Sequence, residues 1–74
     1  NKMTKYIILI DGMSCLHCEN HIERTLSHLD PKMKIKASAK EKSAEILTEK
    51  EITENEFKAA VESAGYIFKG MIKR

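Results

Sequence analysis

Apolar residues open the chain as one short run and later fall into alternating and helical patterns. The opening segment Lys5–Asp11, with sequence KYIILID, has apolar residues on both faces and ends at an Asp-Gly pair. The run is too short for a helix, and its β-branched, two-sided apolar character is typical of a strand inside a sheet. We therefore predict that this segment is a central strand.

A helical pattern follows the Asp-Gly pair. Four residues that avoid the polar face recur three or four positions apart: Cys18, Ile22, Leu26 and Leu29. This spacing predicts an amphipathic helix. We expect its N-terminus at or just after the two cysteines, Cys15 and Cys18, and its end at Asp30-Pro31.

The next segment alternates, which indicates strands. The apolar positions are Met33, Ile35, Ala37 and Ala39, and those between them are lysine or serine. A period of two with one polar face predicts a strand, and its many lysines suit a sheet edge. We predict a turn over Lys40–Ser43 and a third strand over Ala44–Thr48 that pairs back as a hairpin.

Lysines dominate the polar face of this segment and the turn after it: Lys32, Lys34, Lys36, Lys40 and Lys42. Such a stripe either solubilises a sheet edge or attracts an acidic partner. We favour the solubilising role.

The start of the second helix is clearly marked. Thr53 and Glu56 have the spacing of a capping box, and Ile52 and Phe57 flank them as a hydrophobic staple. Gly65 suits the left-handed residue that ends such a helix. A last strand then opens at Tyr66.

The predicted order of elements is βαββαβ. This order packs as an α+β, ferredoxin-like sandwich, in which two helices cover one face of a four-stranded antiparallel sheet. The first and third strands are expected at its centre.

Length and composition narrow the class of protein. The chain has 74 residues, 42% of them hydrophobic and 32% charged, with a net charge of +2. These values indicate one small globular domain, and no basic run interleaved with aromatics suggests nucleic-acid binding. The longest apolar run, Tyr6–Ile10, is too short for a membrane span or a signal peptide. We expect the natural chain to begin at Met3, so that a single domain covers residues 3–74.

The stretch GMSCLHC, residues 12–18, holds both cysteines and is where we place the chemistry. Two cysteines three positions apart at a helix start direct their sulfurs to one spot, which suits a soft-metal site or a disulfide. The positive end of a helix also lowers a thiol pKa and favours the metal-binding thiolate. Two cysteines are too few for a secreted disulfide scaffold, so a reducing cytoplasm is expected.

Several kinds of cysteine chemistry fit this spacing. Thiolates select Cu(I), Zn(II) and related ions. Zinc prefers four ligands, whereas two suffice for Cu(I). A thioredoxin-like redox pair would require a parallel βαβ unit that the predicted order lacks, and a haem-attachment motif would require histidine where Glu19 stands. Metal binding is the favoured interpretation.

Other polar or sulfur-bearing residues near the cysteines have simpler explanations. His17 is one step from a cysteine and points away from the direction that the two sulfurs share, so we expect it to be exposed and to tune thiol acidity. His21 and His28 are expected to be solvated or half-buried. Met13 has a thioether that could bind Cu(I), although core packing is more common for methionine. Tyr66 could simply be a strand residue with its hydroxyl at the surface.

A strand followed by GMSCLHC, with Gly65-Tyr66 after the second helix, resembles the heavy-metal-associated domain. That family contains small copper chaperones and the N-terminal metal-binding modules of copper-pumping P-type ATPases, all with a ferredoxin-like fold. The likeness runs from about Thr4 to Ile72, and the MSCxHC variant is most similar to bacterial copper chaperones. One departure is that the Leu29–Lys32 segment lacks the Gly-Val pair often found there.

The resemblance implies a site and a function. Cys15 and Cys18 would bind Cu(I), or another soft or borderline ion such as Zn(II) or Hg(II). Met13 would pack under the loop, while Ser14, His17 and Tyr66 would lie around the metal without binding it.

The protein would be a soluble cytoplasmic metallochaperone and not an enzyme, monomeric without metal and able to form a metal-bridged dimer. Its partner would be a copper-transporting P-type ATPase or another CxxC protein, with no nucleic acid and no membrane insertion. The alternatives are a regulatory module of such an ATPase, a mercury- or zinc-handling protein, or a thiol redox protein.

Overall fold

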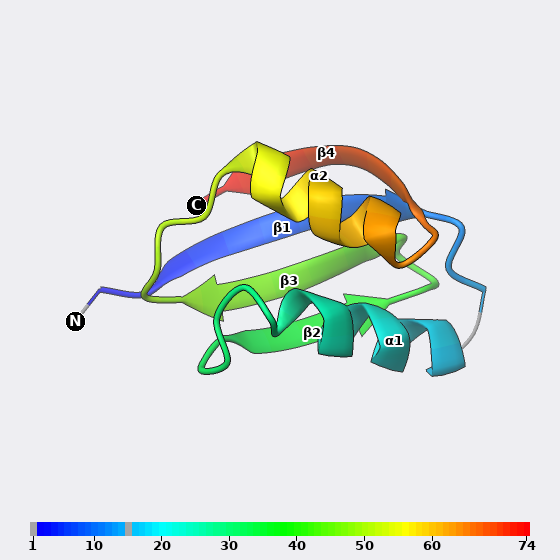
Figure 1. Cartoon of the computed structure of the whole chain (residues 1–74), viewed down its shortest axis with the longest axis horizontal. Coiled ribbons are helices and arrows are strands. Elements are labelled where there is room, and N and C mark those ends of the chain that lie inside the picture. Colours follow the sequence, from blue (N-terminus) through cyan, green and yellow to red (C-terminus); the bar gives the residue numbers. More distant parts are fainter. Residues whose placement is uncertain (1, 15) are drawn as a thin grey trace.

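The computed structural model describes residues 2–14 and 16–74 and contains the predicted βαββαβ order. Its elements are β1 (Thr4–Asp11), α1 (Leu16–Leu26), β2 (Lys34–Ser38), β3 (Ser43–Thr48), α2 (Glu54–Ser63) and β4 (Ile67–Lys73). The strands form one antiparallel sheet in the order β2-β3-β1-β4, and both helices lie on one face of it (Figure 1). The predicted ferredoxin-like sandwich is confirmed, with β1 and β3 central and β2 at an edge.

The first strand is buried on one face only. Tyr6, Ile8 and Ile10 point toward the helices and are at most 1% exposed, whereas Leu9 on the other face is 36% exposed. The apolar residues on both faces therefore correctly indicated a central strand, although the helices cover just one of those faces. The pairing of β1 with β4 shifts register between Leu9 and Ile10.

The core joins the sheet to both helices. Its largest fully buried side chains are Tyr6, Phe57, Ile8, Ile10, Ile22, Leu26, Ile46, Val61 and Thr48. The rings of Tyr6 and Phe57 lie 5.1 Å apart and are tilted by 60°. The buried Tyr6 hydroxyl accepts a hydrogen bond from the Ile52 N–H at 3.1 Å, so this polar group has the partner that burial requires.

The start of α1 agrees with the prediction, whereas its end does not. The helix begins at Leu16, so Cys18 lies inside its first turn, and it ends at Leu26, well before Asp30-Pro31. The His28 and Leu29 N–H groups donate to carbonyls three residues back, which tightens the chain into a turn. Leu29 packs against the core from this turn, so its position continues the apolar spacing of the helix although it lies beyond the helix end.

In the hairpin, β2 is shorter than predicted and β3 is one residue longer. Ala39 already belongs to the turn, and β3 begins at Ser43 instead of Ala44. The turn includes Lys42, whose φ of 57° is in the left-handed region. Its carbonyl accepts a hydrogen bond from the Ile10 N–H at 2.9 Å, which ties the turn to the end of β1.

The second helix has the predicted ends. The Thr53 hydroxyl accepts from the Glu56 N–H at 3.2 Å, and the Glu56 carboxylate accepts from the Thr53 N–H at 2.9 Å. At the other end Gly65 has a φ of +94°, and the Gly65 and Tyr66 N–H groups donate to Glu62 and Val61 carbonyls. The capping box and the glycine end are therefore confirmed, although β4 begins at Ile67 and not at Tyr66.

Within the described part of the chain, no helix combines the length and the apolar character needed to cross a membrane.

Candidate metal-binding site

The connection from β1 to α1, called the cysteine loop below, lies at the end of the molecule away from both termini (Figure 1). The turn between β2 and β3 and the loop between α2 and β4 reach the same end (Figure 1). The fold therefore brings three connections together here, and one of them carries Tyr66.

The chain leaves β1 through Gly12, whose φ of +99° strongly favours glycine. Its N–H donates to the Asp11 side chain at 3.0 Å. A Cβ atom at this position would lie 3.6 Å from Cδ1 of Tyr66, so the Tyr66 ring covers the start of the loop. The backbone conformation and this neighbour explain why glycine precedes the cysteine motif.

Cys18 is half-buried in the first turn of α1 and packs against the core. The Ser14 hydroxyl lies 3.7 Å from the Cys18 sulfur, across the bend between loop and helix. Cys15 is outside the described residues, so the predicted pairing of the two sulfurs stays a prediction.

Met13 and Ser14 lie on opposite sides of the loop. The Met13 side chain is 9% exposed and belongs to the core, whereas Ser14 is exposed. This burial fits the packing role expected for Met13 and leaves its thioether surrounded by apolar side chains.

Tyr66 is half-buried and pairs with a histidine from α1. Its hydroxyl lies 3.4 Å from Nδ1 of His21, and the two rings meet edge to face with centroids 5.8 Å apart. Sequence reasoning assigned His21 no partner, because the 45 positions between these residues conceal their proximity. The pair links α1 to the α2–β4 loop beside the cysteine loop.

His17 is exposed, as expected, and lines a hollow of about 320 Å³ with Asn20, His21 and Arg24. His28 is also exposed. Among residues 2–14 and 16–74, no three His, Cys, Asp or Glu side chains gather closely enough to hold a metal ion. Of the two predicted ligands, the described residues include Cys18 alone, and the metal site stays a prediction.

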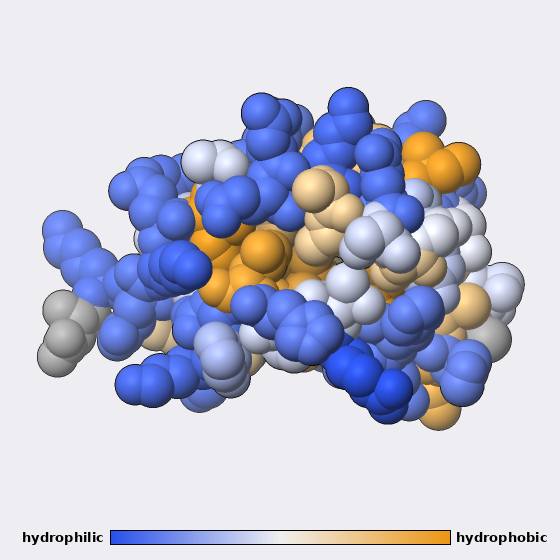
Figure 2. All heavy atoms as spheres, viewed as in Figure 1, coloured by the Kyte–Doolittle hydropathy of each residue, from blue (hydrophilic) through white to orange (hydrophobic). Residues whose placement is uncertain are grey.

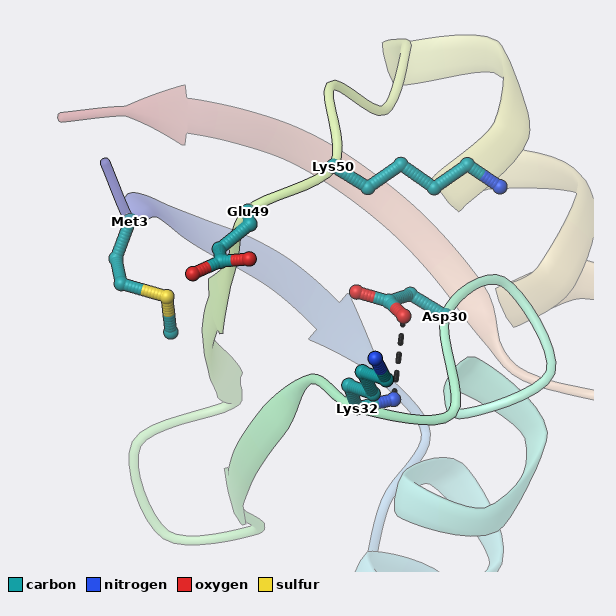
Figure 3. Close-up of a pocket in the computed structure, with 5 residues that line it drawn as sticks. All are labelled: Met3, Asp30, Lys32, Glu49 and Lys50. Atoms are coloured by element: carbon teal, nitrogen blue, oxygen red, sulfur yellow. Dashed lines mark hydrogen bonds between the residues drawn. The ribbon is translucent and has the colours of Figure 1, made fainter. Parts of the chain in front are cut away.

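A second hollow, of about 410 Å³, lies at the opposite end of the molecule. Its lining residues are Met3, Asp30, Lys32, Glu49 and Lys50 (Figure 3). Figure 2 shows apolar atoms between hydrophilic side chains on the face that carries both helices.

Two charged side chains of this hollow, Asp30 and Lys50, are already bonded within the fold. Asp30 accepts from the Thr48 hydroxyl at 2.6 Å and from the Lys32 N–H at 3.1 Å, and Lys50 donates to the Leu29 carbonyl at 2.9 Å. The hydrogen bond from Thr48, followed by that from Lys32, lowers the pKa of Asp30. These bonds hold two loops together, and we place no metal site here.

Two residues that sequence reasoning left on a polar face have specific partners. Glu23 of α1 accepts a hydrogen bond from the Ala37 N–H in β2, and Glu19 accepts one from the Ala39 N–H just after that strand. Spacing along the sequence did not reveal these partners, because they lie 14 and 20 positions away.

Comparisons with known proteins agree with the fold and identify a family. The profile of the heavy-metal-associated domain matches residues 7–66. The copper chaperone CopZ of Staphylococcus epidermidis is 32% identical over 65 residues, which cover 86% of this chain and 96% of that protein.

Solved structures share the architecture. The copper chaperone Atx1 from Synechocystis superposes with a TM-score of 0.74 at 17% identity, covering 85% of this chain and 97% of that one. The yeast copper transporter domain CCC2A gives a TM-score of 0.76 at 22% identity, with 96% and 94% covered. At these identities the structures support the fold, while the profile and the CopZ match identify the family. The chain belongs to the heavy-metal-associated domain family.

Proposed function

We propose that this protein is a copper chaperone that binds Cu(I) through the thiolates of Cys15 and Cys18 and passes it to a partner. The observation that carries the proposal is the match to a copper chaperone over 96% of that protein's length. The position of Cys18 supports it, because the first turn of α1 supplies the positive helix end that favours a thiolate.

Transfer would proceed by ligand exchange. A thiolate of the partner would form a new bond to the bound ion as one of the original copper–sulfur bonds breaks, and a second partner thiolate would then replace the other cysteine in the same way. Copper remains Cu(I) throughout, and no covalent bond of a substrate is cleaved, so we propose a carrier and not an enzyme. Two soft ligands suffice for Cu(I) and leave room for the incoming sulfur.

The neighbours of the sulfurs would shape this exchange without binding copper. Met13 packs beneath the loop, Ser14 approaches the Cys18 sulfur, and Tyr66 covers Gly12. His17 stays exposed, where it would tune thiol acidity.

The proposed partner is a copper-transporting P-type ATPase or another CxxC protein in the cytoplasm, as the resemblance to the heavy-metal-associated family implies. We propose that residues 3–74 form a single domain that is monomeric without metal. A metal-bridged dimer is the alternative for the loaded state. Zn(II) and Hg(II) are competing cargoes that a metal series would separate.

A second candidate function is a metal-binding module of a copper-transporting ATPase. It is favoured by the likeness to the yeast copper transporter domain, which covers 96% of this chain. The two functions use the same site, and they are distinguished by whether the gene continues into membrane helices.

Anaerobic titration of the reduced protein with Cu(I) against a competing chelator tests the proposal. One tightly bound Cu(I) per monomer, retained against Zn(II), supports it. If the protein prefers Hg(II) or Zn(II), that ion and not Cu(I) is the metal that it carries. Weak metal binding together with a reversible Cys15–Cys18 disulfide would instead indicate a thiol redox protein.

A further inference from the structure

The edge strand β2 is bonded to α1 through side chains. Its Ala37 N–H donates to the Glu23 carboxylate at 3.0 Å, and the Ala39 N–H, just beyond the strand, donates to the Glu19 carboxylate at 2.6 Å. An edge strand normally leaves such N–H groups open to solvent or to another chain. Here the helix occupies two of them.

The spacing of the two bonds matches the geometry of both elements. Glu19 and Glu23 are four residues apart on a helix, which is a rise of about 6 Å. Ala37 and Ala39 are two residues apart on extended chain, which is about 6.6 Å. The two carboxylates therefore fit the two N–H groups when the helix and the strand run in opposite directions.

The bond at Glu19 has a particular position. Glu19 directly follows Cys18 in the first turn of α1, whereas Glu23 makes the same kind of bond one turn further on. Helix ends fray, so a hydrogen bond from outside the helix restrains the first turn most. The Glu19 bond ties the turn that bears Cys18 to the turn after β2.

We propose that Glu19 is a positioning residue for the metal site: by accepting the Ala39 N–H it fixes the orientation of the Cys18 sulfur. This inference rests on the proposed function, since it concerns Cu(I) binding at Cys18. Glu19 does not bind the metal, and it acts only through the backbone that it holds.

Two substitutions at Glu19 distinguish the effect of side-chain length from the effect of the carboxylate charge. Glu19→Asp keeps the charge but shortens the side chain, so the bond to Ala39 is lost. Glu19→Gln removes the charge but keeps a carbonyl oxygen at the same reach. Glu23→Asp is the matched control, because it breaks the equivalent bond away from the cysteines.

Cu(I) affinity is measured for each variant by chelator competition, together with thermal unfolding of the apo protein and hydrogen exchange of the Ala37 and Ala39 amides. We expect Glu19→Asp to weaken Cu(I) binding by about tenfold, the lower end of the range for residues that orient metal ligands. Glu19→Gln and Glu23→Asp should bind like wild type. Faster exchange is expected at Ala39 in Glu19→Asp and at Ala37 in Glu23→Asp.

Two results would overturn the inference. Equal Cu(I) affinity in Glu19→Asp and Glu23→Asp would make the bond purely structural. Weak binding by Glu19→Gln with normal binding by Glu19→Asp would assign the effect to charge. If wild type itself fails to bind Cu(I), the proposed function fails instead, and the exchange data still report whether the bond exists.

Discussion

The two helices of this domain are held in different ways. The ends of α2 are fixed by its own neighbourhood, through the Thr53–Glu56 capping box and the Gly65 turn. The side of α1 is fixed by Glu19 and Glu23, whose backbone partners are 20 and 14 positions away. Hydrogen bonds between near neighbours thus fix α2, whereas bonds to distant residues hold α1, the helix that carries Cys18.

Because of this difference, we expect mutations at the α2 cap to affect stability and mutations around α1 to affect metal binding. A change at the α2 cap affects only groups within the same turn, so its effect should stay in the free energy of unfolding. A change around α1 alters the relation of the cysteine loop to the sheet. We therefore expect mutations in the two helices to affect different measurements.

The largest expected effect is at the cysteines. Replacing Cys15 or Cys18 with serine exchanges a soft thiolate for a hard, protonated hydroxyl, so Cu(I) affinity should fall by orders of magnitude in either variant. Circular dichroism should show a retained fold. Near-wild-type affinity in both single variants, measured by chelator competition, would eliminate the proposed site.

A smaller effect is expected at the cap of α2. Thr53→Ala removes the hydroxyl that accepts the Glu56 N–H and should cost about 1 kcal/mol of stability. Cu(I) affinity should remain unchanged, because this cap lies at the end of α2 away from the connection between β1 and α1 (Figure 1). Thermal unfolding and Cu(I) competition are measured on the same variant. Unchanged unfolding with much weaker copper binding would contradict the comparison.

Lowering the pH should also weaken the capping box of α2, because it protonates the Glu56 carboxylate. The backbone N–H of Thr53, and then its hydroxyl, lower the pKa of Glu56 below its ordinary value of 4.5. The unfolded state then binds more protons than the folded state, so this contribution is present above pH 4.5 and is lost as pH falls through the folded pKa. Denaturant unfolding of apo protein between pH 7 and 3 should show a shallower acid loss in Glu56→Gln. Identical pH profiles would rule out this contribution.

The smallest effect is expected at His17, which belongs to α1 but is exposed. His17→Ala should still bind one Cu(I) per monomer, while the pH at which the thiols ionise shifts. Absorbance of the thiolates during a pH titration measures that shift. A loss of copper binding comparable to that of a cysteine variant would show that the imidazole is a ligand.

The sequence was most informative where the signal is local. The capping box of α2 and the glycine after it involve residues within a few positions, and both were predicted correctly. The end of α1 was predicted wrongly because Leu29 continues the apolar spacing after the backbone has left the helix. Apolar spacing reports which side chains are buried, and it does not report which carbonyl each N–H bonds.

By itself the sequence determined the order of elements, the central position of β1, the capped second helix and the cysteine motif at the start of α1. These follow from periodicity, turn residues and spacing, which act over short distances along the chain. Only the tertiary structure decided that Tyr66 meets His21 and that Glu19 reaches Ala39. Such contacts depend on how α1 packs against distant parts of the chain, and no local pattern encodes that packing.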